Sequence, residues 1–318
     1  MKSIFAAVLL AAATQVMAQQ GYPAKPVRFI VAQPAGAGPD IMARLIGDRL
    51  SKVWGQSVIV DNRPGGASIP GTVSAANAAP DGYTMYMATG GVLLNVHTFK
   101  QLPYDPDQQL VPVAFIGKAP FMLSVHPSVP ASTLGELVAH LKANPGKLSI
   151  ASEGPRSLGG MMVEYLMVLT GTKMVHVPYN GAAAGLQDTM AGRTQVTMQS
   201  ATATTPHAKA GKLRPLAVTS SRPVTGFESV PPLNKTFRDF EYVGWYMLYA
   251  PIETPAAIVQ KVNRDIDAVL KEPDMAQKLA DLGPVIEGVG TPASLRQFHK
   301  QEHARWAKLV KATNFEPQ

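Results

Sequence analysis

Two corners of the chain join an apolar run to a helical repeat through glycine-bearing turns. Residues 34–40 (PAGAGPD) lie between the apolar run 27–32 and a helical pattern that starts at Ile41. Residues 152–157 (SEGPRS) lie in the same position before a helical pattern that starts at Leu158. Backbone amides in the first turn of a helix have no partner inside the helix, and the helix dipole adds positive potential there. Both corners are therefore predicted to bind an acid group of a ligand.

The residue types of the first corner fit a carboxylate better than a nucleotide. Gly36 and Gly38 let the backbone approach a ligand closely. The third glycine of a dinucleotide motif and the lysine of a P-loop are both missing. Asp40 would repel a bare phosphate, and we interpret it as an N-cap or first-turn acid that fixes the loop. The ligand-binding residues predicted in this corner are Gln33, Gly36, Ala37, Gly38, Pro39 and Asp40.

Three later loops are expected to reach the same ligand. Thr89 and Gly90 follow a predicted strand at 83–88, which places them at the carboxyl edge of the sheet that carries the first corner. Ligands of open α/β sheets bind at that edge. Tyr179 and Ser200 follow two further strands and offer an aromatic ring and a hydroxyl group. A plain surface loop is the alternative interpretation of Thr89 and Gly90.

Arg156 and Ser157 open the helix of the second corner. A guanidinium group can hold a carboxylate through two parallel hydrogen bonds, and a serine hydroxyl can add another. If Arg156 faces a cleft, it is suited to a second, distal carboxylate of the ligand. The alternative is an arginine that faces solvent.

Catalytic and metal-binding patterns find little support in the sequence. The chain has no cysteine and no Gly-x-Ser-x-Gly motif. His299 and His303 are four residues apart but lack the acid of a His-Glu-x-x-His zinc motif. We therefore predict no catalytic residue, no metal site and no cofactor. An α/β enzyme such as a hydrolase, with Ser157 as its nucleophile, is the catalytic alternative.

The elements that must position these residues alternate between strands and helices. A strand at 27–32, a helix from Ile41 and a strand at 57–60 form a βαβ unit, which predicts a parallel sheet. The same order recurs at 148–151 and 158–169. We therefore expect two similar α/β lobes with a central cleft, the second lobe inserted in the first. One large doubly wound sheet is the alternative.

Composition restricts the class of protein and its partners. The chain has 318 residues, a net charge of +7, 46% hydrophobic residues and 16% charged residues. This content is too apolar for a disordered chain. Lysine and arginine are scattered along the sequence without a basic stripe, so nucleic acid is not expected as a partner.

The first residues have the pattern of a secretory signal peptide. Lys2 precedes the apolar run 4–13, and Ala18 marks a plausible cleavage site. A membrane anchor is the alternative, but ten apolar residues are too few to cross about 30 Å of hydrocarbon. We predict a signal peptide at 1–18 and export to the periplasm.

Six short segments, in their order along the chain, carry a family resemblance. From about Tyr22 to the C-terminus the chain resembles the substrate-binding receptors of tripartite tricarboxylate transporters, known as the Bordetella uptake gene (Bug) family. The segments are 34–40 (PAGAGPD), 60–66 (VDNRPGG), 79–84 (APDGYT), 102–106 (LPYDP), 176–181 (HVPYNG) and 210–220 (AGKLRPLAVTS).

The resemblance implies a periplasmic binding protein fold of the type II kind, in which two α/β lobes close over a ligand. The first lobe would comprise 19–118 and 240–318, and the second 119–239, with hinges near 117–120 and Phe240. It implies binding without turnover and delivery of the ligand to membrane permease subunits.

The resemblance also assigns roles to the loops. The first corner and Thr89–Gly90 would hold one ligand carboxylate, and Ser157 and residues near Ser200 would contribute from the second lobe. Relatives that bind amino acids carry an acid near Ser200, and its absence here argues against an amino group in the ligand. Arg156 favours a diacid.

The sequence therefore predicts a monomeric periplasmic receptor for a small organic dicarboxylate. Tyrosine and methionine side chains would also suit an aromatic diacid. A sensing module that passes the same ligand signal to a signalling partner is the alternative.

Overall fold

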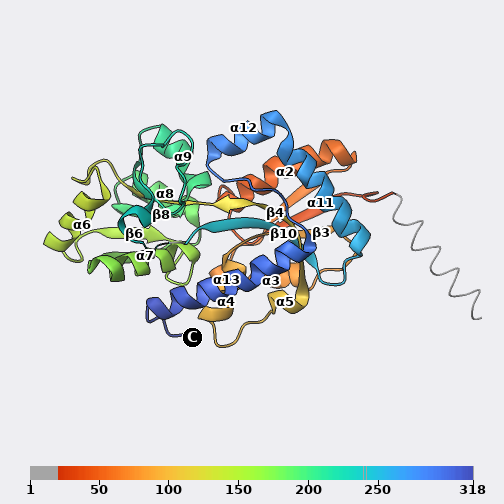
Figure 1. The fold of residues 1–318 in the computed structure, drawn as a ribbon, viewed down its shortest axis with the longest axis horizontal. Coiled ribbons are helices and arrows are strands. Elements are labelled where there is room, and N and C mark those ends of the chain that lie inside the picture. The colour runs from red at the N-terminus through yellow and green to blue at the C-terminus, as the bar shows by residue number, and fades with distance from the viewer. Residues whose placement is uncertain (1–20, 239, 241, 318) are drawn as a thin grey trace, which may run out of the picture.

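Residues 21–238, 240 and 242–317 of this computed structural model are described, and they form two five-stranded sheets with helices packed against them (Figure 1). The predicted signal peptide at 1–18 lies outside the described residues. The strands of the first sheet are β1 (Val27–Val31), β2 (Val58–Asn62), β3 (Thr84–Thr89), β4 (Leu110–Ala119) and β10 (Gly244–Pro251). The strands of the second sheet are β5 (Phe121–Val125), β6 (Ser149–Ser152), β7 (Val175–Pro178), β8 (Val196–Ser200) and β9 (Arg214–Val218).

The two sheets have matching strand orders, β2-β1-β3-β10-β4 and β7-β6-β8-β5-β9. In the first, β1 runs parallel to both β2 and β3. In the second, β6 runs parallel to both β7 and β8. Because parallel neighbours end at the same edge, the loops that follow β1 and β3, and those that follow β6 and β8, are brought together in pairs. The expected two-lobed α/β architecture is confirmed.

The first sheet is covered on both faces because its strands alternate between two apolar cores. Phe29 and Met85 belong to the core under α2 and α11, whereas Ile30 and Tyr86 point to the opposite core. The helices around this sheet are α2 (Gly38–Trp54), α3 (Ile69–Ala76), α4 (Gly91–Thr98), α5 (Pro106–Gln109), α11 (Ala256–Lys271), α12 (Pro273–Leu282) and α13 (Pro292–Ala312).

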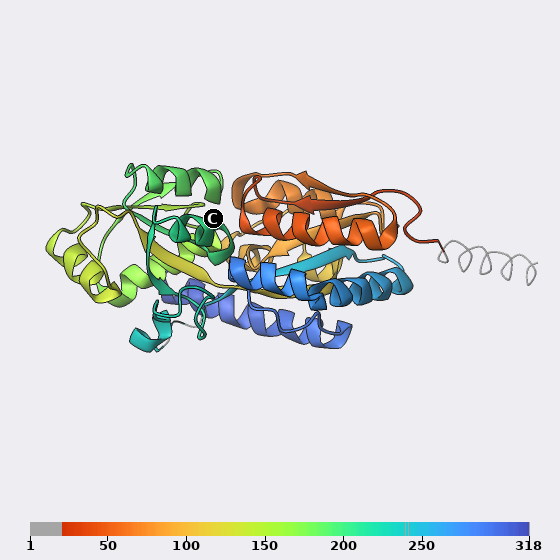
Figure 2. The same cartoon turned by 90° about the horizontal axis from the view of Figure 1, so that it is seen from above.

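The second lobe has its helices arranged around a shorter sheet. They are α6 (Leu134–Ala143), α7 (Leu158–Thr170), α8 (Ala182–Met190), α9 (Ala201–Lys209) and α10 (Leu233–Thr236). The view from above separates this yellow-green lobe from the orange and blue lobe, with the dark blue α13 running beneath both (Figure 2). Among the described helices, none combines the length and apolar character needed to cross a bilayer.

Only Pro120 separates β4 of the first sheet from β5 of the second. Strand β4 continues through Gly117 to Ala119, into the segment 117–120 where a hinge was expected. The reason is its pairing with β10, in which Gly117 lies opposite Tyr246. A side chain at Gly117 would meet the carbonyl oxygen of Val285 at 2.8 Å, so the glycine serves close packing rather than a turn.

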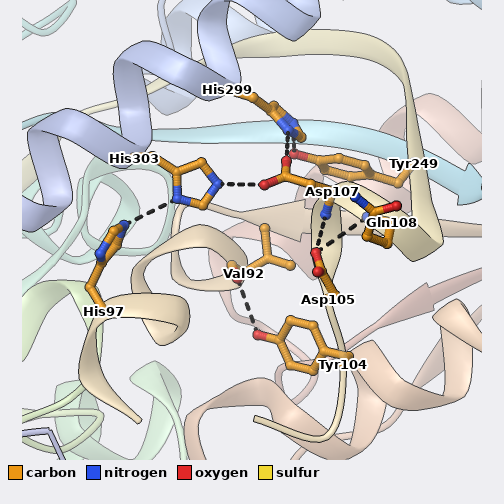
Figure 3. A network of polar contacts seen from close by, with 9 residues as sticks. All are labelled: Val92, His97, Tyr104, Asp105, Asp107, Gln108, Tyr249, His299 and His303. Atoms are coloured by element: carbon orange, nitrogen blue, oxygen red, sulfur yellow. Dashed lines mark hydrogen bonds and ion pairs between the residues drawn. The ribbon is translucent and has the colours of Figure 1, made fainter. Parts of the chain in front are cut away.

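A polar network attaches α13 to the first lobe (Figure 3). Asp107 contacts two histidines of α13, with its carboxylate oxygens 3.3 Å from Nδ1 of His299 and 3.0 Å from Nε2 of His303. The hydroxyl of Tyr249 is 2.7 Å from Nε2 of His299, and His97 of α4 is 3.1 Å from His303. Within the described chain, no group of His, Asp and Glu side chains is arranged to hold a metal ion.

Candidate ligand-binding cleft

A cleft lies between the two lobes, and the two glycine-bearing corners form opposite walls of it. The first corner contributes Gln33, Ala37, Gly38 and Pro39. Helix α2 starts at Gly38 with Ala37 as its N-cap, and no side chain caps it. Pro39 in this first turn has no amide hydrogen, and the other amides of the helix start are left for water or a ligand, as an anion site requires.

Gly36 and Asp40 are not among the described residues that line the cleft. Asp40 instead stabilises the loop of the first corner. The buried Asp40 carboxylate accepts hydrogen bonds from the amide of Gly36 and from Nδ2 of Asn62, both at 2.9 Å, and pairs with Arg44. Burial alone would raise its pKa, but the hydrogen bonds from Arg44, Gly36 and Asn62 outweigh burial and lower it. The residue is a first-turn acid that fixes the loop, as interpreted, while Ala37 is the N-cap.

Glycine is required at position 36 by the backbone conformation there. Its φ of 82° lies in the left-handed region that favours glycine, and this conformation directs its amide to Asp40. The amide of Gly36 is thus used within the loop, and the contact of Gly36 with a ligand stays a prediction.

A wall that the site prediction did not include is formed by residues 64–68, which follow β2. Nε2 of Gln33 donates to Oγ of Ser68 at 2.9 Å, and Nδ2 of Asn95 donates to the carbonyl of Ala67 at 2.8 Å. Oε1 of Gln33 is buried and has no partner among the described residues. The only signal for this wall in the sequence was the family motif at 60–66.

The loop after β3 brings Thr89 to the cleft, but Gly90 is not among the described lining residues. Gly90 packs beneath the C-terminal helix instead, where a Cβ would lie 3.1 Å from Cζ2 of Trp306. The neighbouring Gly91 and Asn95 of α4 line the cleft in its place. Helix α4 was not predicted from the sequence.

In the second lobe, Ser157 lines the cleft as the N-cap of α7. Its Oγ accepts from the amide of Gly160 at 3.0 Å and donates to the carbonyl of Gly154 at 2.7 Å. The hydroxyl is thus occupied by the helix start, and no histidine contacts it within the described chain. Its geometry is that of a helix cap and not of an activated nucleophile.

Arg156 lines the cleft rather than facing away from it. Its guanidinium carbon is 5.0 Å from the ring centre of Phe99 and 6.0 Å from that of Phe315. Its Nε is buried without a hydrogen-bond partner, and no carboxylate of the described residues pairs with it. An arginine held between aromatic rings and lacking an acid is well placed to receive a ligand carboxylate.

The remaining predicted residues, Tyr179 and Ser200, also line the cleft. The Tyr179 hydroxyl donates to Oδ2 of Asp188 at 2.8 Å, so its ring rather than its hydroxyl is available. Oγ of Ser200 accepts from the amide of Ala203 at 3.4 Å, as the N-cap of α9.

The lobes touch each other across the cleft. The hydroxyl of Tyr246, on β10 of the first sheet, donates to Oγ1 of Thr202 in the second lobe at 3.2 Å. A Cβ on Gly38 would overlap the Tyr246 hydroxyl and lie 2.7 Å from Oγ of Ser200. A Cβ on Gly181 would lie 2.8 Å from Cδ of Pro34. Glycine at both positions permits this close approach.

Glu153 is a lining residue that the prediction missed. Burial raises the pKa of its carboxyl group, and the backbone amide of Ala182 at the start of α8 partly offsets this by stabilising the ionised form. The position of Glu153 inside the second corner motif was the available signal.

Comparison with known proteins identifies the family. The profile described as "Tripartite tricarboxylate transporter family receptor" matches residues 42–315. Protein BugT of Bordetella pertussis is 32% identical over 297 residues, covering 92% of this chain and 90% of BugT.

Two solved structures share the fold. The R. palustris protein Rpa4515, solved with adipate, is 30% identical with a TM-score of 0.89, covering 93% of this chain and 100% of that one. The periplasmic binding protein BugD is 27% identical with a TM-score of 0.88, again covering 93% and 100%. The chain therefore belongs to the tripartite tricarboxylate transporter receptor family, with the fold of periplasmic binding proteins, and is a solute-binding receptor rather than an enzyme.

Proposed function

We propose that this protein captures a small organic dicarboxylate in the periplasm and delivers it to membrane permease subunits. The observation that carries the proposal is Arg156, a cation in the cleft that no acid of the described residues neutralises. The relative Rpa4515 was solved with adipate, a dicarboxylate, which supports the same class of ligand.

Each of the two walls binds one carboxylate of the ligand. One carboxylate lies at the start of α2, where Gly38 and Thr89 line the cleft and no side chain caps the helix. The other lies against Arg156 and the start of α7 at Ser157. Charge-assisted hydrogen bonds at both ends, desolvated by closure, suit a dissociation constant of about 1 μM or lower.

The middle of the cleft is lined by aromatic side chains. Phe121, Trp245 and Tyr246 contribute from the strands, and the ring of Tyr179 from the second lobe. These surfaces suit the apolar spacer of a diacid, either an aliphatic chain or an aromatic ring.

A ligand screen tests the proposal directly. Purified protein is melted with mono-, di- and tricarboxylates of increasing chain length, and positives are measured by calorimetric titration. A ligand that binds only the folded state stabilises it by about 2.7 kcal/mol at a concentration of 100 times Kd. We expect dicarboxylates to raise the melting temperature most. A chain that responds to monocarboxylates equally well, or to no carboxylate, contradicts the proposal.

We further propose that the protein works as a monomer that opens and closes about Pro120 and the return segment near Phe240. These two crossings connect the lobes, and the contact of Gly181 with Pro34 belongs to the closed form. Solution scattering should show a smaller radius of gyration with a bound dicarboxylate than without one. Equal radii would count against closure.

A further inference from the structure

The second corner holds an acid as well as a base. Glu153 and Arg156 lie in one turn, both line the cleft, and they form no ion pair with each other. No cation of the described residues lies within 4.0 Å of the Glu153 carboxylate. Among the described residues, the backbone amide of Ala182 stabilises its ionised form.

An unpaired carboxylate at this place opposes the binding of a plain dicarboxylate. The negative charges of the ligand and of Glu153 would be enclosed together when the lobes close. A buried charge is strongly unfavourable unless it is both paired with an opposite charge and hydrogen-bonded. The charge of Glu153 also extends to the centre of the cleft: after burial itself, it is among the causes that raise the pKa of Tyr246.

An acceptor of Gln33 has no donor among the described residues. Oε1 of Gln33, on the opposite wall, is buried without a partner among the described residues, and Gln33 as a whole is 8% exposed. The described residues therefore supply no donor to Gln33 Oε1 and no cation to Glu153, so a ligand that brings its own donor fits better than one with acceptors alone.

We propose that the ligand is a dicarboxylate that carries a protonated amino group, and that Glu153 binds this group while Arg156 binds the adjacent carboxylate. The inference rests on the proposed function and names its substrate class. Because Glu153 and Arg156 share one turn, they are suited to a carboxylate and an ammonium group on neighbouring atoms.

The proposal revises one expectation from the sequence. The lack of an acid next to Ser200 argued against an amino group in the ligand. The fold supplies an acid from a different element, since β6 and β8 are parallel neighbours whose following loops, with Glu153 and Ser200, both line the cleft.

Pairs of diacids that differ only by an amino group provide the test: succinate with aspartate, glutarate with glutamate, and adipate with 2-aminoadipate. Each is titrated calorimetrically at pH 7.5 into the wild-type protein, Glu153→Gln and Glu253→Gln. Glu253 is exposed and lies outside the cleft, so it is a matched control. Glutamine keeps the acceptor oxygen that faces Ala182, and thermal melts check that each variant is folded.

We expect one amino diacid to bind the wild type at least tenfold more tightly than its parent diacid. Glu153→Gln should reduce this advantage to threefold or less without weakening the parent, and Glu253→Gln should keep it. Parent diacids that bind as tightly as their amino partners, or an advantage that survives in Glu153→Gln, would overturn the role of Glu153 and leave the dicarboxylate proposal standing. Failure of every diacid to bind the wild type would overturn both.

Discussion

The two corners of the cleft have the same backbone plan and offer different chemistry. At the first, Asp40 is turned inward to Gly36 and Arg44, so the wall presents uncharged groups and helix amides. At the second, Glu153 and Arg156 both line the cleft.

The first corner is suited to bind carboxylates in general, whereas the second is suited to select among them. Helix amides attract any carboxylate, because they supply positive potential without a shape of their own. Charged side chains also require a matching arrangement of charges on the ligand. We infer that the first corner binds the acid group common to all ligands of this class and that the second distinguishes among them.

Filling the space beside Gly38 at the first corner should have the largest effect on ligand affinity. We expect Gly38→Val to reduce affinity for every carboxylate by more than about 100-fold, because its Cβ would overlap the Tyr246 hydroxyl and fill the start of α2. Calorimetric titration measures the loss.

Gly135→Val, at an exposed position of α6, is the matched control and should bind normally. If Gly38→Val proves unfolded, the smaller Gly38→Ala replaces it. Unchanged affinity in a folded variant would show that the first corner does not touch the ligand.

The second-largest effect should be selective for dicarboxylates. Hydrogen bonds to a charged group contribute about 1.5–3 kcal/mol each, so Arg156→Ala should weaken dicarboxylates by about 10–100-fold. Monocarboxylates, which use the first corner alone, should change by less than about threefold. Competition titrations compare the two.

Arg193→Ala serves as control, since Arg193 is exposed and pairs with Asp188 in the same lobe. Equal losses for mono- and dicarboxylates in Arg156→Ala would remove the proposed division between the corners.

A moderate effect is expected when the first corner loses the carboxylate of Asp40, which stabilises its loop. Asp40→Asn removes the charge that holds Gly36 and Arg44, which should lower the free energy of unfolding by about 1–3 kcal/mol and weaken every ligand alike. Because the folded pKa of Asp40 is lowered, its stabilisation is present above the usual value of 3.8 and lost as pH falls below it.

Urea unfolding at pH 7 and pH 3 measures both parts of this prediction, with the exposed Asp48→Asn of the same helix as control. A variant with wild-type stability at pH 7 would exclude a structural role for Asp40.

The smallest expected effect is a pH-dependent loss of stability at α13. This helix packs against α4, which lines the cleft with Gly91 and Asn95. Burial lowers the pKa of His299, although its contact with Asp107 opposes this. The unfolded chain therefore takes up the proton first, so stability present above pH 6.5 is lost as pH falls toward the folded pKa. Protonation also removes the acceptor that Tyr249 uses.

Melting curves at pH 7.5 and 5.5 should show this loss in the wild type and a smaller one in His299→Gln. Equal pH dependence in the two proteins would assign the loss to other groups.

Much of the architecture could be predicted from the sequence, because hydrophobic periodicity and the glycine and proline residues that interrupt it are local features of the chain. The alternation of apolar runs with helical repeats, interrupted by glycine and proline, identified both βαβ units and the strand-to-helix corners. Local signals failed for α9, whose residues Ala201–Lys209 are rich in threonine and include Pro206. That helix is weak in propensity and is stabilised by packing in the second lobe.

The sequence alone predicted an acid-binding site at corners 34–40 and 152–157, since the first backbone amides of a helix have no partner inside the helix. The tertiary structure alone decided which of the candidate residues line the cleft. It turned Asp40 to the loop, buried Gly90 beneath Trp306 and placed Glu153 beside Arg156 in the cleft. The direction of a side chain depends on neighbours that are distant in the chain, and these become neighbours only when the two sheets are assembled.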